Sequence, residues 1–342
     1  MCKCLHSFRK INNNFEVLAI ENIAASTAGG RNTVIYILGS ARSGSTILNI
    51  LLGNNNSIFS AGELNRYVSS GWIGNEYCSC GVRVSDCEFW PQVQRSVETS
   101  LKVNPYEIAE ITRGLENWRN ILYWWKRKRL KCDIDKHNLF YERFIESVLE
   151  HTDASHLVDA SKDPARLSYL SQVKSLDIYT IHIVRDPRAI CWSKSKPFKS
   201  NPKAGVEKDL ASIPYWRTMK SIYMNVLLAV IHKYRNPKDR YLRIKYEDLA
   251  NNTNPVLGTL ESYLGVDFSS VSKRLKSTDG LDQEHTVAGN RLRMNKKIKL
   301  NYDNSWVSDA PLSQRIWTTI LALPLLLILG YKVIPTVQKN AK

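Results

Sequence analysis

A segment rich in glycine and hydroxyl groups, Gly39-Ser-Ala-Arg-Ser-Gly-Ser-Thr46, follows directly after the apolar residues 34–38. Its frame, G-x-x-x-x-G-x-[ST], is that of a phosphate-binding loop, in which glycines let the backbone approach an anion at a helix start. A loop that turns over ATP or GTP carries lysine where this chain has Ser45. The segment therefore predicts a site for a phosphate-like group other than a triphosphate tail. Its donors are the guanidinium of Arg42, the hydroxyls of Ser40, Ser43, Ser45 and Thr46, and the backbone around Gly44.

A second candidate anion site follows the β-branched residues 178–184. Arg185 comes at the end of this run, Pro187 suits the first turn of a helix, and Ser193 lies about two helical turns further on. An anion could bridge the guanidinium of Arg185 and the hydroxyl of Ser193. The alternative is a local ion pair between Arg185 and Asp186, with Ser193 as a solvated helix residue.

Short apolar segments alternate with helical patterns along most of the chain. Such alternation predicts an α/β fold, a P-loop-like parallel sheet flanked by helices, with ligands at the carboxyl ends of the strands. The expected strands are residues 33–38, 57–60, 156–159, 178–184 and 241–245. The expected helices are residues 45–52, 164–172, 213–234 and 254–264, and one that starts at Pro187.

The remaining segments suggest one domain with additions. Residues 1–32 are polar and lack a clear period, so they predict a loose leader before a single domain over residues 33–342. Residues 71–137 form a helical, cysteine-containing insertion in which acceptor recognition is expected. Its aromatic side chains could stack on sugar rings or pack in the core. Residues 313–335 predict an apolar helix, and because Pro324 interrupts it, a buried terminal helix is favoured over a membrane anchor.

Charge and cysteine content narrow the partners and the compartment. The 48 Lys and Arg residues exceed the 32 Asp and Glu residues by 16, which means either general solubility or attraction of polyanionic ligands. The basic run 126–129 is interpreted as a solvated helix face, so no nucleic-acid partner is expected. The first thirty residues contain no secretory signal, so a cytoplasmic, reducing compartment is expected.

Three of the seven cysteines, Cys78, Cys80 and Cys87, lie close together in the sequence. This spacing could hold zinc or a redox disulfide. No paired C-x-x-C and no nearby histidine completes a ligand set, so no metal is predicted.

The two anion-binding segments together resemble the nucleotide motifs of PAPS-dependent sulfotransferases (PAPS is 3′-phosphoadenosine 5′-phosphosulfate), in the branch that includes bacterial and carbohydrate enzymes. The resemblance covers residues 33–332. Supporting motifs are Cys78-Ser-Cys80-Gly81 with Cys87-Glu-Phe-Trp90, Val158-Asp-Ala-Ser-Lys162, Tyr246-Glu-Asp-Leu249, and His285 through Gly289-Asn-Arg-Leu-Arg293 to Trp306.

The resemblance implies roles for individual residues. The loop residues Arg42 to Thr46 would hold the 5′-phosphosulfate, although many family members have lysine in place of Arg42. Arg185 and Ser193 would hold the 3′-phosphate. Asn290, Arg291 and Arg293 stand where the family has a loop that closes over the nucleotide.

The implied reaction is direct sulfuryl transfer from PAPS to an acceptor hydroxyl or amine, with no metal. Glu63 is the expected base and His285 the second candidate, while Arg42 and Lys162 would stabilise charge on the bridging oxygen. Lys162 is also expected to pair with Asp159 or Asp163. A carbohydrate or glycan-bearing acceptor is favoured. Two alternatives are a P-loop kinase without the lysine and a non-enzymatic module that binds polyanions.

Overall fold

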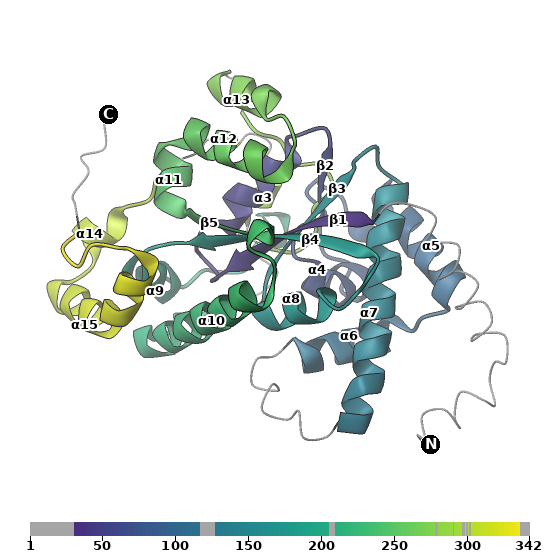
Figure 1. Cartoon of the computed structure of the whole chain (residues 1–342), viewed down its shortest axis with the longest axis horizontal. Coiled ribbons are helices and arrows are strands. Elements are labelled where there is room, and N and C mark those ends of the chain that lie inside the picture. The colour runs from purple at the N-terminus through teal and green to yellow at the C-terminus, as the bar shows by residue number, and fades with distance from the viewer. Residues whose placement is uncertain are drawn as a thin grey trace.

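A parallel sheet forms the centre of the molecule, and helices cover both of its faces (Figure 1). The computed structural model describes residues 31–116, 127–204, 209–277, 280–289, 291–295, 298, 300 and 302–335. The strands stand in the order β2-β3-β1-β4-β5, and every neighbouring pair is parallel. Their bounds are β1 Asn32–Gly39, β2 Ile58–Ser60, β3 His156–Lys162, β4 Leu176–Val184 and β5 Tyr241–Lys245. The predicted α/β fold is confirmed.

The central strand β1 explains why residues 34–38 are apolar at every position. Val34 and Leu38 belong to a hydrophobic core on one face of the sheet, whereas Ile35 and Ile37 belong to a second core on the other face. Side chains alternate between faces along a strand, and a parallel sheet covered by helices buries both sets. The strand therefore carries the phosphate-binding loop out of the most buried part of the protein.

The helices divide between the two faces and one end of the sheet. The core around Ile35 includes side chains from α3 (Ser45–Gly53), α11 (Tyr246–Asn251), α12 (Thr253–Leu264) and α13 (Ser269–Lys276). The core around Val34 includes side chains from α5 (Trp90–Leu101), α7 (Arg127–Glu150) and α8 (Pro164–Leu170). A third core joins α9 (Pro187–Ser195) and α10 (Tyr215–Arg235) to the end of β4. Short 3-10 turns are η4 (Pro202–Ala204), η5 (Lys238–Arg240) and η6 (Arg291–Met294).

The predicted insertion packs onto the sheet through its aromatic residues. After β2 come α4 (Leu64–Arg66), the π-helix η1 (Tyr67–Ile73), the cysteine-containing loop with η2 (Val84–Asp86), α5, α6 (Pro105–Leu115) and α7. Trp90 is fully buried, with its ring centroid 4.4 Å from that of Tyr67 and 6.2 Å from that of Phe144. These rings fill the core rather than a sugar site. Trp118, Trp124, Trp125 and the basic run 126–129 lie outside the residues whose side chains are described.

The C-terminal helix is only partly buried, which corrects the expectation of a buried terminal helix. After α14 (Ser305–Asp309), α15 (Leu312–Leu329) contacts α9 and α10 through residues such as Leu325 and Leu329. Its other side exposes Trp317 by 66% and Leu327 by 70%. Within the described residues, α15 is long and apolar enough to cross a bilayer on length and composition alone.

Candidate active site

The phosphate-binding loop connects β1 to α3, as its sequence predicts. Within the loop, Ser43 N–H donates to Ser40 O at 3.1 Å, and Gly44 has a φ of +94° immediately before the helix begins at Ser45. Ser45 is buried, while Ser40 and Thr46 are half-buried. Ser43 Oγ is buried and has no hydrogen-bond partner among the described residues. The loop thus presents a helix start and an unused buried hydroxyl, both suited to an anion.

Gly44 lies against the ring of Tyr246, the first residue of α11. A Cβ atom at Gly44 would stand 2.4 Å from Cδ2 of Tyr246. The guanidinium carbon of Arg185 lies 4.4 Å from the centroid of the same ring, on which it can stack as a cation. One aromatic side chain therefore contacts both predicted anion-binding segments.

We expect Gly44→Ala to lower the free energy of unfolding by more than the cost of its positive φ alone, which is about 1–2 kcal/mol. The added methyl must also displace Tyr246. Gly265→Ala is the matched control, because Gly265 has a φ of +70° and nothing lies within 4 Å of its added Cβ. Urea unfolding of both variants measures the difference. Equal losses would mean that the ring moves aside without cost.

Arg185 leaves the end of β4 and turns toward the phosphate-binding loop. Its Nη1 donates to Arg42 O at 3.2 Å, and its Nη2 donates to Asp303 O at 2.8 Å and lies 3.3 Å from Asp303 Oδ2. Its Nε is buried and has no hydrogen-bond partner among the described residues. The proposed local pair with Asp186 is not formed, because Asp186 binds Arg188 and caps α9. Ser193 lies half-buried on α9, with no hydrogen bond to the side chains described.

Glu63 and Lys162 form an ion pair beside the loop. Lys162 ends β3 with a φ of +69°, and its Nζ lies 2.5 Å from Glu63 Oε1 and 2.9 Å from Ala160 O. Burial alone would raise the pKa of Glu63, but the Lys162 ammonium, with smaller contributions from Arg66 and Arg293, holds that pKa below its usual range. Glu63 is therefore a carboxylate at neutral pH. The predicted pairing of Lys162 with Asp159 or Asp163 is wrong.

Those two aspartates have other partners. Asp163 caps α8, whereas the fully buried Asp159 accepts a hydrogen bond from Arg166 Nε at 2.8 Å. Arg166 is itself fully buried, and its Nη1 also contacts Glu116 Oε1 at 2.6 Å. Asp159 also accepts a hydrogen bond from the hydroxyl of Ser161. The oxygen of that hydroxyl in turn accepts a hydrogen bond from the backbone N–H of Asn65, two positions after Glu63. This buried network fixes the end of β3 and the backbone just after Glu63, and so positions the Glu63–Lys162 pair.

Two residues that the sequence analysis did not single out also belong to the site. Asn225 of α10 donates to Gly39 O at 3.1 Å and to Lys162 O at 3.4 Å, so it joins the ends of β1 and β3. Lys194 follows Ser193 on α9. Burial lowers the pKa of Lys194, and the nearby cations Arg42 and Lys162 lower it further. The site is thus rich in positive charge, which suits an anionic ligand.

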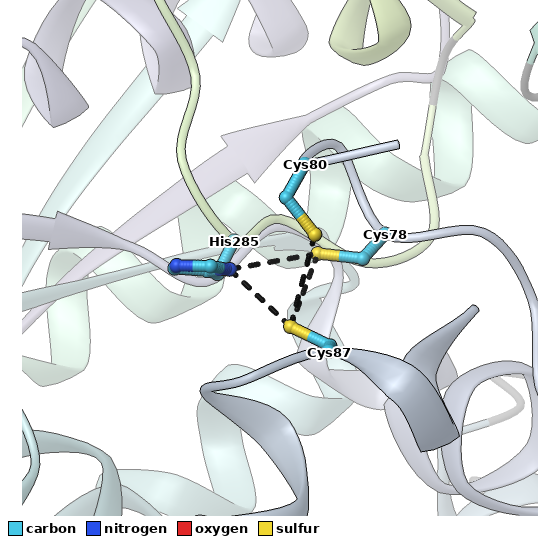
Figure 2. A group of neighbouring side chains, drawn as sticks. All are labelled: Cys78, Cys80, Cys87 and His285. Atoms are coloured by element: carbon cyan, nitrogen blue, oxygen red, sulfur yellow. Dashed lines mark hydrogen bonds between the residues drawn. The ribbon is translucent and has the colours of Figure 1, made fainter. Parts of the chain in front are cut away.

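His285, the second candidate base, lies with the three cysteines (Figure 2). Its Nδ1 is 3.3 Å from Cys87 Sγ and 4.0 Å from Cys78 Sγ, and these two residues with Cys80 complete the group. We call Cys78, Cys80, Cys87 and His285 the cysteine–histidine cluster. The expectation that no histidine accompanies the cysteines is wrong, because the histidine comes from a segment 198 residues beyond Cys87.

The late loop is described in part. Arg293 is buried, and its Nη2 lies 3.2 Å from Tyr77 O and 3.7 Å from Glu76 Oε2. These contacts anchor it to the cysteine-containing loop, and its predicted contact with a nucleotide stays a prediction. Asn290 and the side chain of Arg291 lie outside the described residues.

Comparison with known proteins places this chain in a family. The sequence model of the Sulfotransferase family matches residues 34–270, which contain the phosphate-binding loop, Glu63, Lys162, Arg185 and Ser193. A search of the curated proteins found no match to the sequence.

Solved structures that match this chain include a sulfotransferase domain, a sulfotransferase and a retinol dehydratase. The sulfotransferase domain from the Synechococcus PCC 7002 olefin synthase is 22% identical, with 90% of this chain and 97% of that chain covered and a TM-score of 0.48. Sulfotransferase STF9 from Mycobacterium avium is 10% identical, with 92% and 81% covered and a TM-score of 0.49. Retinol dehydratase in complex with retinol and PAP is 13% identical, with 87% and 82% covered and a TM-score of 0.38. On the family match, which covers most of the chain, this protein belongs to the sulfotransferase family and is an enzyme of sulfuryl transfer.

Proposed function

We propose that this enzyme moves the sulfuryl group of PAPS directly to a hydroxyl or amine of a carbohydrate or glycan-bearing acceptor. The observation that carries the proposal is the joint contact of Tyr246 with Gly44 and Arg185. Tyr246 holds the two proposed anion-binding segments together, next to the paired Glu63 and Lys162.

The residues present fit the donor. The 5′-phosphosulfate would lie in the loop formed by Ser40, Arg42, Ser43, Gly44, Ser45 and Thr46, where Ser43 Oγ is a buried hydroxyl that no other described group uses. The 3′-phosphate would contact Arg185, whose Nε is a buried donor of the same kind, together with Ser193 on α9. Asn290, Arg291 and Arg293 remain candidates to close over the nucleotide.

In the proposed transfer, the acceptor oxygen attacks sulfur in line with the bridging oxygen of the donor. The new S–O bond forms as the old one breaks, and its electron pair stays on the leaving phosphate of adenosine 3′,5′-bisphosphate. Glu63 takes the proton of the acceptor hydroxyl and passes it to solvent. The cations of Arg42, Lys162 and Lys194 stabilise the charge that builds on the leaving oxygen. Arg42 acts there as a fixed charge, since arginine hardly releases a proton.

Family likeness, the cysteines and the C-terminal helix support the proposed acceptor and compartment. The likeness to the carbohydrate branch favours a sugar hydroxyl, on a small molecule or a glycan, and no nucleic acid. The thiols of the cysteine–histidine cluster favour the cytoplasm, because an oxidising compartment would pair them. The exposed apolar side of α15 supports contact with a membrane surface more strongly than the sequence alone did. Transfer of labelled sulfate from PAPS across a panel of sugars, phenols and lipids tests the acceptor class.

We expect Arg185→Ala to weaken binding of adenosine 3′,5′-bisphosphate about thirtyfold or more, since loss of one partner from a buried charged contact costs at least about 2 kcal/mol. Calorimetry measures this affinity. Arg217→Ala removes the same charge from an exposed position on α10 and should leave the affinity unchanged. ATP should bind the unmodified enzyme far more weakly than the bisphosphate.

Other results would favour the alternatives. Equal affinity for ATP, with a requirement for Mg²⁺, would support a kinase. Salt-sensitive binding of polyanions without any turnover of PAPS would support a binding module.

A further inference from the structure

The cysteine–histidine cluster has no part in the transfer proposed above. Two segments far apart in the sequence supply its members, and their four ligand atoms all lie within 4.8 Å of one another. Cys78 and Cys87 are buried, His285 is half-buried and Cys80 is exposed. Figure 2 shows the three sulfur atoms and the ring nitrogen turned toward one another.

The separations match the edges of a tetrahedral zinc site. Cys87 Sγ lies 3.8 Å from Cys80 Sγ and 3.9 Å from Cys78 Sγ, and His285 Nδ1 lies 3.3 and 4.0 Å from the sulfurs of Cys87 and Cys78. Zinc binds thiolate at about 2.3 Å and imidazole at about 2.0 Å, so a tetrahedron places two sulfurs about 3.8 Å apart and sulfur and nitrogen about 3.5 Å apart. A disulfide would instead require two sulfurs about 2.05 Å apart.

The backbone around the cysteines also suits metal-binding thiolates. Cys78-Ser-Cys80-Gly81 forms a tight turn, in which Gly81 has a φ of +97° and donates to Cys78 O at 3.0 Å. Each sulfur accepts at least one hydrogen bond from a backbone N–H group, and such bonds support thiolate ligands. The donors are Cys80 for Cys78, Val82 for Cys80, and Phe89 and Trp90 for Cys87.

His285 is held in a fixed orientation toward the sulfurs. Its ring is stacked on Phe89, with centroids 5.3 Å apart and an angle of 17° between the planes. The segment before it is tied to the cysteine turn, since Ser79 Oγ donates to Glu284 O at 2.6 Å. Both ligand-bearing segments are thus positioned by contacts that do not involve a metal.

We propose that the cysteine–histidine cluster binds one zinc ion through its three sulfurs and His285 Nδ1. Four protein ligands fill the tetrahedron, so the ion has a structural role and no open position for water. Binding displaces the thiol protons to solvent and changes no oxidation state.

The ion would fix the late loop beside the catalytic pair. Two residues after His285, Val287 pairs with Gly62 in a parallel bridge. A Cβ at Gly289 would stand 3.2 Å from Glu63 Oε1, so the loop backbone closely approaches the proposed base. Through His285, the zinc would link this late loop to the turn that carries Cys78 and Cys80.

Metal analysis of the full-length chain, purified without a histidine tag from zinc-supplemented medium, tests the proposal. We expect about one zinc per chain. Cys87→Ser and the exposed Cys80→Ser should each retain far less, whereas Cys132→Ser, outside the cluster, should retain the full amount. Replacement of zinc by Co²⁺ should give the absorption band of thiolate-to-cobalt charge transfer, and Cys87→Ser should weaken it.

If Cys87→Ser does not fold, the metal content of the unmodified chain and of Cys80→Ser still decides. A chain that holds no zinc and has three freely reactive thiols would overturn the proposal. A disulfide between Cys80 and Cys87 in protein purified without oxygen would overturn it as well.

Discussion

Glu63→Gln is expected to lower kcat about 10²–10⁴-fold while the affinity for adenosine 3′,5′-bisphosphate stays nearly unchanged. Glutamine keeps the shape of the side chain and cannot accept the proton of the acceptor. The donor contacts proposed for the phosphate-binding loop and Arg185 do not involve Glu63. Single-turnover assays of sulfate transfer and calorimetry with the bisphosphate measure the two quantities separately.

The dependence of kcat on pH distinguishes a base from a residue that only positions Lys162. A base acts in its unprotonated form, and the Lys162 ammonium holds the pKa of Glu63 below its usual range. Activity should therefore be lost only as the pH falls through this lowered pKa. Lys162→Met removes the cation, so the acidic limb of its profile should move to higher pH.

Two controls complete this experiment. Glu146→Gln removes a carboxylate from a partly exposed ion pair on α7 and should leave kcat unchanged. Glu63→Ala should regain part of its activity when formate is added, because formate can supply the missing carboxylate. Turnover of Glu63→Gln equal to that of the unmodified enzyme would remove Glu63 as the base.

Arg166→Leu should lower the free energy of unfolding by about 3–5 kcal/mol, the usual result of removing one partner from a buried ion pair. Arg166 and Asp159 are fully buried, and Glu116 is nearly so. The substitution removes the guanidinium that both carboxylates share, leaving Asp159 without its cation and Glu116 with only His137 as a partner. Urea unfolding, or the yield of soluble protein if the variant is too unstable, measures the loss.

The pH dependence of this variant follows from the same charges. Burial raises the pKa of Glu116 and the Arg166 cation helps to hold it below its usual range, so in the variant the folded-state pKa of Glu116 should rise. The folded state then prefers to bind protons, so the deficit should shrink as the pH falls. Arg143→Leu is the matched control, because it breaks partly exposed pairs with Glu146 and Glu150 that contribute about 1 kcal/mol or less. An equal loss in both variants would contradict the assigned role of Arg166.

The parts of the site that depend on local sequence could be predicted. The loop from Gly39 to Thr46 follows a buried strand and starts a helix, and both features are fixed by neighbouring residues. The position of Arg185, directly after the buried strand β4, could be predicted in the same way. Lys194 also has a local signal in the sequence, since it adjoins Ser193. Asn225 had one too, as a polar residue among the apolar positions of α10.

The choice of partners could not be predicted, because it depends on which strands are neighbours. Asp159 and Lys162 both belong to β3, yet one side chain faces Arg166 in the core and the other faces Glu63 at the sheet edge. The meeting of His285 with Cys87 likewise depends on how the late loop returns across the fold, which no local pattern records.

The ring of Tyr246 separates two parts of the proposed donor site. Its ring contacts both the loop glycine and Arg185, so in the proposed mode of donor binding this one side chain, from the residue after β5, helps to fix the distance that a doubly charged donor must span. A shorter side chain at this position should relax that demand for length, because both segments would lose the ring that they contact. On the proposed function, discrimination among donors would then depend in part on a residue with no charge of its own.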